Sequence, residues 1–116
     1  MGGRWPPDIT KFPRVSAMAL RDMFNLSGLD DQVKSGEVVE IIVENNHPSA
    51  PVADEPFCTR SQMVEYRKRS SWEALALFHR YLRVDGTIGA SGLRDPKALR
   101  VGTLVYMLED ASPRRI

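Results

Sequence analysis

The sequence of 116 residues predicts an α+β fold: an N-terminal helix packed on an antiparallel sheet of four to five strands, with a short helix before the last strand. Two observations lead to this prediction. Apolar residues follow helical spacing after residue 16, and period-two alternation dominates later segments that glycine and proline separate. The length fits one domain, with an extended arm (1–15), a globular core (16–110) and a basic tail (111–116).

The arm holds three prolines and two large apolar residues, Trp5 and Phe12, with no periodic structure that would bury them. Exposed apolar side chains of this kind favour association. We therefore expect a homo-oligomer, with a dimer favoured, whose contact includes Trp5 and Phe12.

Helical signals begin at Ser16, which can cap a helix over residues 16–27, and Gly28 suits the position at its end. Residues 29–36 predict one or two further helical turns, because acidic residues stand at their start and a glycine at their end.

Two strands are expected next. Residues 37–45 alternate β-branched side chains and predict a strand with one well-buried face. Residues 61–69 predict a second strand, with Val64 and Tyr66 on one face. Between the two strands, residues 45–58 contain three prolines and predict a long surface loop, which makes this segment a candidate for binding.

Residues 73–83 fit two patterns. A capping box at Ser70 and Glu73, followed by apolar residues at helical spacing, slightly favours a helix. The same residues also alternate with period two and lead directly into Asp85-Gly86, the signal of a tight hairpin. Periodicity alone leaves both structures open.

The run HRYLRVDGTIGASGLRDPKAL resembles a segment of small uncharacterised bacterial proteins, some of them carried by phages or other mobile elements. In those proteins the part before Asp-Gly is richer in β-branched residues. The resemblance implies that residues 73–83 form a strand, which pairs with the next segment of the chain through the Asp85-Gly86 turn or a short loop nearby. It brings no established activity and implies no functional residue.

Three glycines, Gly86, Gly89 and Gly92, raise the question of a phosphate-binding loop. The Lys and Ser/Thr of a nucleotide loop do not follow them, and no βαβ unit surrounds them. The sequence therefore favours a turn, in which Gly86 supplies a positive φ and Gly89 marks a bulge or close packing. Asp95 would then cap a short helix over residues 95–100.

The alternative for this stretch is a small anion site, in which Arg94, Lys97 and the 91–97 backbone bind a phosphate or carboxylate at the helix start. After it, residues 102–110 alternate again and predict the last strand.

Charge divides the chain. Residues 1–58 hold five Lys/Arg and nine Asp/Glu, whereas residues 59–116 hold eleven Lys/Arg and six Asp/Glu. This asymmetry suits attraction between the halves, and it also supports nucleic-acid binding as an alternative function. That alternative assigns phosphate contacts to five cations and base stacking to a tyrosine: Arg67, Lys68, Arg69, Arg80, Arg83, and Tyr66 or Tyr81.

Catalysis has less support in the sequence. His79 could serve a small-ligand enzyme whose pocket lies between helix and sheet, but nothing nearby in the chain would orient it as a base. The only cysteine, Cys58, and two histidines complete no zinc set, so no metal or cofactor is predicted.

A single cysteine also favours a reducing cytoplasm, and no apolar run reaches the length of a membrane span.

The leading hypothesis for the function is a non-enzymatic binding or interaction protein that associates with itself, while enzymatic activity stays an open alternative.

Overall fold

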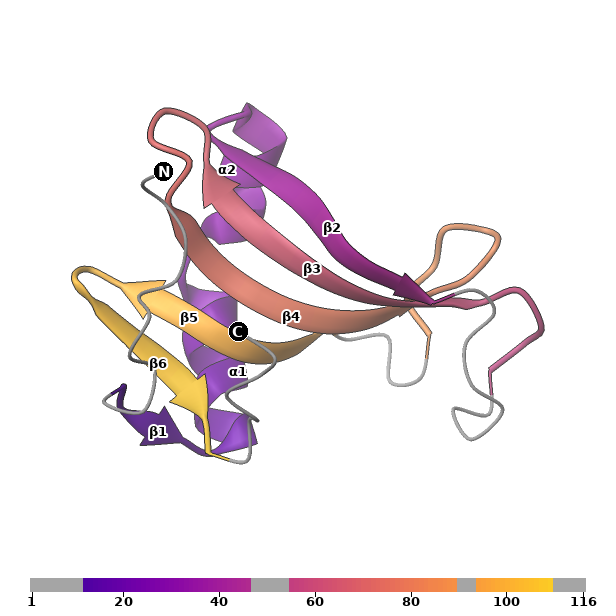
Figure 1. Cartoon of the computed structure of the whole chain (residues 1–116), viewed down its shortest axis with the longest axis horizontal. Helices are drawn as coiled ribbons and strands as arrows, with labels where there is room; N and C mark the ends of the chain where they lie inside the picture. Colours follow the sequence, from indigo (N-terminus) through magenta and orange to yellow (C-terminus); the bar gives the residue numbers. More distant parts are fainter. Residues whose placement is uncertain (1–11, 47–54, 90–93, 110–116) are drawn as a thin grey trace.

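The computed structural model describes residues 12–46, 55–89 and 94–109, and this part of the chain forms two helices and one six-stranded sheet (Figure 1). The elements are β1 (Arg14–Val15), α1 (Ala17–Leu26), α2 (Leu29–Ser35), β2 (Val38–Asn46), β3 (Arg60–Lys68), β4 (Ala74–Leu82), β5 (Asp95–Val101) and β6 (Leu104–Leu108). The predicted α+β class, with a helix on a sheet, is confirmed.

The strands lie in the order β1-β6-β5-β4-β3-β2. Neighbours from β2 to β6 are antiparallel, whereas β1 pairs with β6 in parallel, through Arg14↔Met107 and Val15↔Leu108. The sheet is therefore mixed and larger than the antiparallel sheet of four to five strands that we expected. A strand of two residues is too short to give a period-two pattern, which is why the sequence did not reveal β1.

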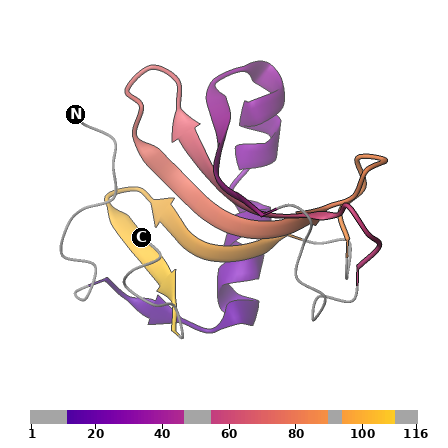
Figure 2. The ribbon, with the colours of Figure 1, turned by 45° about the vertical axis from the view of Figure 1, so that its right-hand side comes forward.

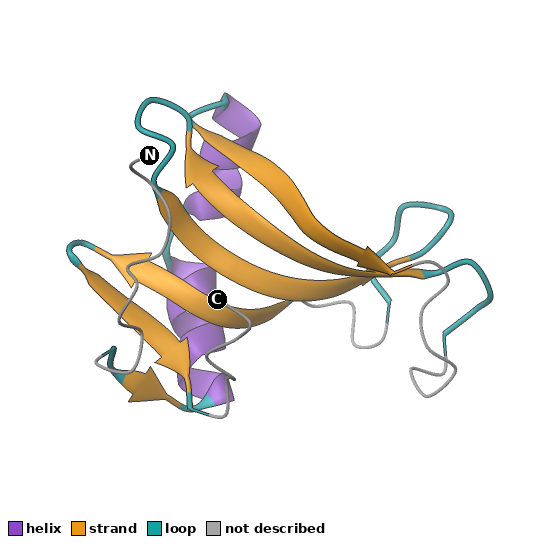
Figure 3. Ribbon diagram, in the orientation of Figure 1, coloured by secondary structure: helices purple, strands orange, loops and turns teal. Residues whose placement is uncertain are grey.

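Both helices lie on one face of the sheet, as the turned view and the view coloured by structure show (Figure 2, Figure 3). The caps match the prediction. The Ser16 hydroxyl accepts a hydrogen bond from the Ala19 amide at 3.1 Å, and Gly28 takes the left-handed conformation with φ of +76°. Gly36 ends α2 in the same way, with φ of +88°.

Residues 73–83 form a strand, as the resemblance implied. The helical pattern was misleading because the middle of β4 is covered on both faces: Ala76, Leu77 and Phe78 are all buried. A strand with apolar residues at nearly every position satisfies any period, so periodicity could not distinguish the two structures.

The short helix expected at residues 95–100 is wrong, because these residues are strand β5. Ala98 and Leu99 are fully buried and pair with Met107 and Tyr106 of β6. Pairing on both sides of β5 outweighs the local helix-start signal of Asp95 and the proline after it.

The expectation of a well-buried face on β2 is also wrong. Only Val38 of this strand is buried, and Ile42 and Val43 are each 46% exposed. β2 is the outer strand of the sheet, so a β-branched pattern that suits burial lies largely in solvent.

The core has a cluster of apolar side chains on each face of the sheet. On the helix face the Phe78 ring meets Phe24 and Tyr66 edge-on, at 5.5 and 5.0 Å between centroids. On the opposite face Phe12 of the arm packs against the cluster around Met107. Trp5, the other residue of the predicted oligomer contact, lies outside the described residues.

Candidate ligand-binding groove

The sheet forks at one end. The ladder between β4 and β5 ends at the pair Ala76↔Leu99, although β4 begins at Ala74 and β5 continues to Val101. Over the same residues β4 stays paired with β3, and β5 with β6. The β2–β3–β4 part and the β5–β6 part therefore diverge, on the left of Figure 1.

A groove of about 610 Å³ opens at this divergence, between the sheet and the junction of α1 with α2. We call it the fork groove. Its volume falls in the range of known ligand pockets, and its apolar lining comes from both helices and three strands. The apolar residues are Met23, Leu26, Leu29, Val38, Leu75 and Val101.

The lining also contains four charged residues: Glu37, Lys68, Glu73 and Arg100. The Arg100 Nε donates to the Ala74 carbonyl at 2.8 Å and its Nη1 lies 4.0 Å from the Glu73 carboxylate, so Arg100 bridges the fork. Within the described part of the chain, the side chains of Glu37 and Lys68 form no ion pair.

Large apolar side chains are exposed at this end of the sheet. Leu26 is 87% exposed and Val101 is 47% exposed at the edge of the fork groove. Leu104 at the start of β6 is 51% exposed, and Trp72 before β4 is 42% exposed although the Arg67 guanidinium lies over its ring. Exposed apolar surface beside a groove is typical of sites that bind a ligand or a protein.

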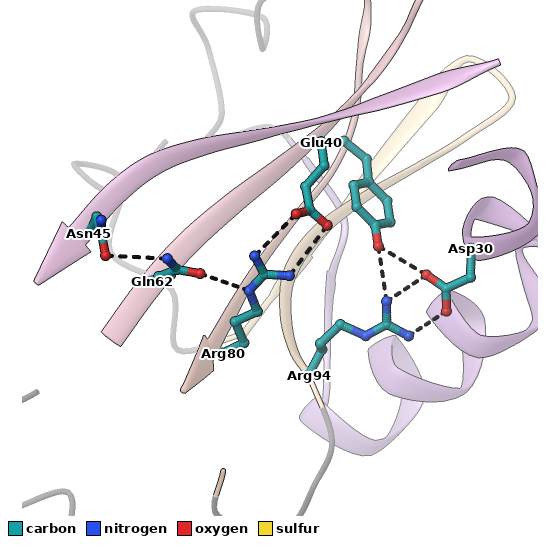
Figure 4. Close-up of polar contacts among 7 residues, drawn as sticks. Asp30, Glu40, Asn45, Gln62, Arg80 and Arg94 are labelled. Atoms are coloured by element: carbon teal, nitrogen blue, oxygen red, sulfur yellow. Dashed lines mark hydrogen bonds and ion pairs between the residues drawn. The ribbon is translucent and has the colours of Figure 1, made fainter. Parts of the chain in front are cut away.

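A compact polar cluster lies farther along the helix face (Figure 4). The Arg94 guanidinium binds both carboxylate oxygens of Asp30, and its Nη1 donates to the Tyr66 hydroxyl at 2.9 Å. The guanidinium also lies over the rings of Phe24 and Phe78, at 5.2 and 5.6 Å from their centroids. The hydrogen bond from Arg94 lowers the pKa of Asp30, and burial raises the pKa of Tyr66 to about 12.

Next to this cluster, four side chains bond to one another across β2, β3 and β4, as Figure 4 shows. Arg80 donates to both carboxylate oxygens of Glu40, at 3.1 and 3.3 Å, and to the Gln62 carbonyl at 2.9 Å. Gln62 in turn donates to Asn45 at 3.3 Å. We call Glu40, Arg80, Gln62 and Asn45 the cross-sheet polar chain, and its charges neutralise each other.

The anion site proposed around Arg94 and Lys97 loses its helix start, because β5 replaces the expected helix. Arg94 is held by Asp30, and the Lys97 ammonium lies 3.6 Å from the Asp95 carboxylate. Residues 91–93 of that site lie outside the described residues. The anion site therefore stays a prediction, without a helix start and with both of its cations already paired to carboxylates.

The glycine stretch is a turn where it is described. Gly86 has φ of +89°, and its amide donates to the Arg83 carbonyl. The Thr87 amide donates to the Asp85 carboxylate, and the Gly89 amide donates to the Tyr81 carbonyl. These three amides are bonded within the chain, so they do not form the open cradle that a phosphate requires. Gly92 lies outside the described residues.

Gly89 has a packing role. A Cβ at this position would collide with the Glu55 carboxyl group, whose Cδ it would approach to 2.7 Å. The Glu55 side chain is only 4% exposed and forms an ion pair of 2.9 Å with Arg83. Close packing, one of the two roles predicted for Gly89, is confirmed.

His79 lies on the face of the sheet opposite the helices, because it continues the alternation of Leu77 and pairs in register with Met63. Its Nε2 is 2.8 Å from the Ser61 hydroxyl, and its ring meets Tyr81 edge-on. His79 therefore does not face the helices and does not line the fork groove, and a ligand pocket near it stays a prediction. Within the described ranges, no cluster of His, Cys, Asp and Glu could hold a metal ion.

The residues of the nucleic-acid alternative do not share one surface. Arg67 is buried beside Glu65 at 2.5 Å, on the face opposite Arg80. Tyr66 is 2% exposed in the core and cannot stack on a base. Arg83 is paired with Glu55, and of the five cations only Lys68 and Arg69 are exposed.

None of the helices in the described residues is long and apolar enough to cross a membrane. Comparisons of the chain with protein-family models, with curated proteins and with solved structures found no match.

Proposed function

We propose that this protein is a non-catalytic binding module that holds an apolar group of a ligand or partner in the fork groove. The observation that carries the proposal is an apolar lining open to solvent, in which Leu26 is 87% exposed. Covering apolar surface is favourable by roughly 25 cal/mol per Å², so an occupant that removes this lining from water gains affinity.

The lining favours binding over catalysis. Its apolar side chains come from packed helices and strands, and Arg100 is engaged with the Ala74 carbonyl and Glu73. His79, the candidate base, lies on the other face of the sheet. Pockets that hold a ligand without chemistry need shape and a few orienting polar groups, and the fork groove supplies both.

The test is a titration of the ¹⁵N-labelled protein with 1-anilinonaphthalene-8-sulfonate, an apolar dye with one anionic group, at low protein concentration. We expect saturable chemical-shift changes at the amides of Leu29, Leu75 and Gly102, which line or adjoin the groove. The amides of Gly86 and Thr87, at the opposite end of β4, should not move.

A matched pair of variants locates the binding. Val101→Trp fills the fork groove and should weaken dye binding by about tenfold or more. Val84→Trp adds the same ring at an exposed site outside the groove, and should leave binding unchanged. Equal effects of the two variants, or no saturable shift at the groove amides, would refute the proposed function.

A further inference from the structure

The surface around the fork groove combines a protrusion with a hollow. Leu26 projects into solvent from the end of α1, and the apolar lining that includes Leu29 and Leu75 lies beside it. A two-fold interface uses the same patch on both copies, so it requires a protrusion and a hollow on one surface. This patch meets that requirement.

Charge on the same patch is self-complementary. Lys68 and Glu37 both line the groove, and neither forms an ion pair within the described part of the chain. They are close together, because Lys68 pairs in register with Val38, the residue after Glu37. A two-fold axis near this point brings Lys68 of one copy to Glu37 of the other, and the reverse, so two ion pairs form at once.

Of the two residues predicted to form a contact between copies, Trp5 and Phe12, the structure describes only Phe12. Phe12 packs against the cluster around Met107 in its own chain. Of the nine large apolar side chains that are exposed in the described residues, four belong to the forked end: Leu26, Trp72, Val101 and Leu104.

From these features we infer that the occupant of the fork groove is a second copy of this chain, in a two-fold dimer. Leu26 of each copy enters the groove of the other, and Lys68 faces Glu37 across the interface. The inference rests on the proposed function, because it requires the groove to accept an apolar group.

The test is sedimentation velocity of the full chain over a range of concentrations, with reversed charges. Lys68→Glu sets four carboxylates together at the interface, and Glu37→Lys sets four ammonium groups together, so each should weaken the dimer by about tenfold or more. The double variant restores opposite charges and should recover most of the wild-type affinity. Glu44→Lys, an exposed reversal away from the groove, is the control and should change nothing.

Leu26→Ser provides a second, independent test and should abolish the dimer. Met18→Ser is its control, because Met18 is also on α1 and is 74% exposed but does not line the groove. A wild-type chain that stays monomeric at about 100 µM, or a double charge variant no better than the single ones, overturns the inference.

Failure of the inference can be told apart from failure of the proposed function. If the chain is monomeric and the dye still binds at the groove amides, the groove binds apolar groups and only the second copy is refuted. If the double charge variant recovers the dimer but the monomeric protein does not bind the dye, the dimer stands and binding of free apolar groups is refuted. Where both hold, dye and second copy exclude each other, so raising the protein concentration weakens apparent dye affinity.

Discussion

The two ends of strand β4 differ in whether the polar groups around them have hydrogen-bond or ionic partners in the described residues. At the end that leads into the 83–87 turn, the cross-sheet polar chain is internally bonded, and the turn amides donate within the chain. At the forked end, Lys68 and Glu37 have no ionic partner in the described residues and Leu26 faces water. The described part of a conspicuous glycine motif thus belongs to a closed structure, whereas the binding that we propose lies where two strands stop pairing.

The difference has a simple physical origin. An amide or carboxylate that already has its hydrogen bonds gains little from a ligand, because a new contact must first break an old one. An apolar lining has no hydrogen bonds to lose, so covering it with a ligand or partner is favourable.

The largest loss of stability is expected when one member of a bonded polar cluster is removed. Arg94→Ala leaves Asp30 and the Tyr66 hydroxyl without their cation and uncovers two aromatic rings. We expect a loss of about 2–3 kcal/mol in the free energy of unfolding, measured by urea denaturation. Lys97→Ala, whose ion pair with Asp95 is longer, at 3.6 Å, should cost less than about 0.5 kcal/mol. Equal losses of stability in the two variants would show that the contact of Arg94 with Asp30 adds no more than an ordinary surface ion pair.

Gly89→Ala tests the closed packing at the turn. The new Cβ would meet the buried Glu55 carboxylate, so we expect a loss of about 1–3 kcal/mol. Gly86→Ala has open space around it but keeps a positive φ, and should cost about 1 kcal/mol. Thermal or urea unfolding of both variants measures the difference. A neutral Gly89→Ala would mean that Glu55 moves freely away.

Acid should weaken the Asp30–Arg94 pair specifically. The pKa of Asp30 is lowered in the folded protein by the Arg94 hydrogen bond, so the unfolded chain binds a proton more readily. Its contribution is complete above the ordinary value of 3.8 and is lost as the pH falls through the lower folded value. Stability of the wild type and Asp30→Asn should therefore converge below about pH 4. A constant gap between them would contradict the prediction.

The smallest effects are expected at the fork. Lys68→Gln and Glu37→Gln remove charges that have no ionic partner in the described residues, so each should change monomer stability by less than about 0.5 kcal/mol. Measurements must be made at a concentration where the chain is monomeric. A loss comparable to that of Arg94→Ala would erase the difference between the two ends.

The sequence predicted those parts of the fold that depend on local chemistry. Ser16, Gly28 and Gly36 bound the helices through capping and left-handed backbone, and both signals are visible in a short window. Strand β5 was missed because its conformation depends on pairing with β4 and β6, which no local pattern encodes. The same reason explains why the contact between Arg94 and Asp30, which are 64 residues apart, was not predicted.

The candidate site was harder to predict. The fork groove depends on where the β4–β5 ladder ends, and that is a property of the whole sheet. One residue gave a usable signal: Leu26 lies off the side of α1 that carries the buried Leu20 and Phe24, and a large apolar residue outside the buried stripe of a helix indicates a second contact.

Strand β2 carries a safeguard against misassembly. As the outermost strand of the sheet, with Ile42 and Val43 each 46% exposed, it resembles a template on which other chains could polymerise. Its register shifts between Ile42 and Glu44, and glutamates flank the apolar stretch. The irregular step interrupts the regular edge of the strand, and the exposed charge of Glu44 repels a stacked copy. The chain can therefore expose an apolar edge strand and still resist growth into fibres.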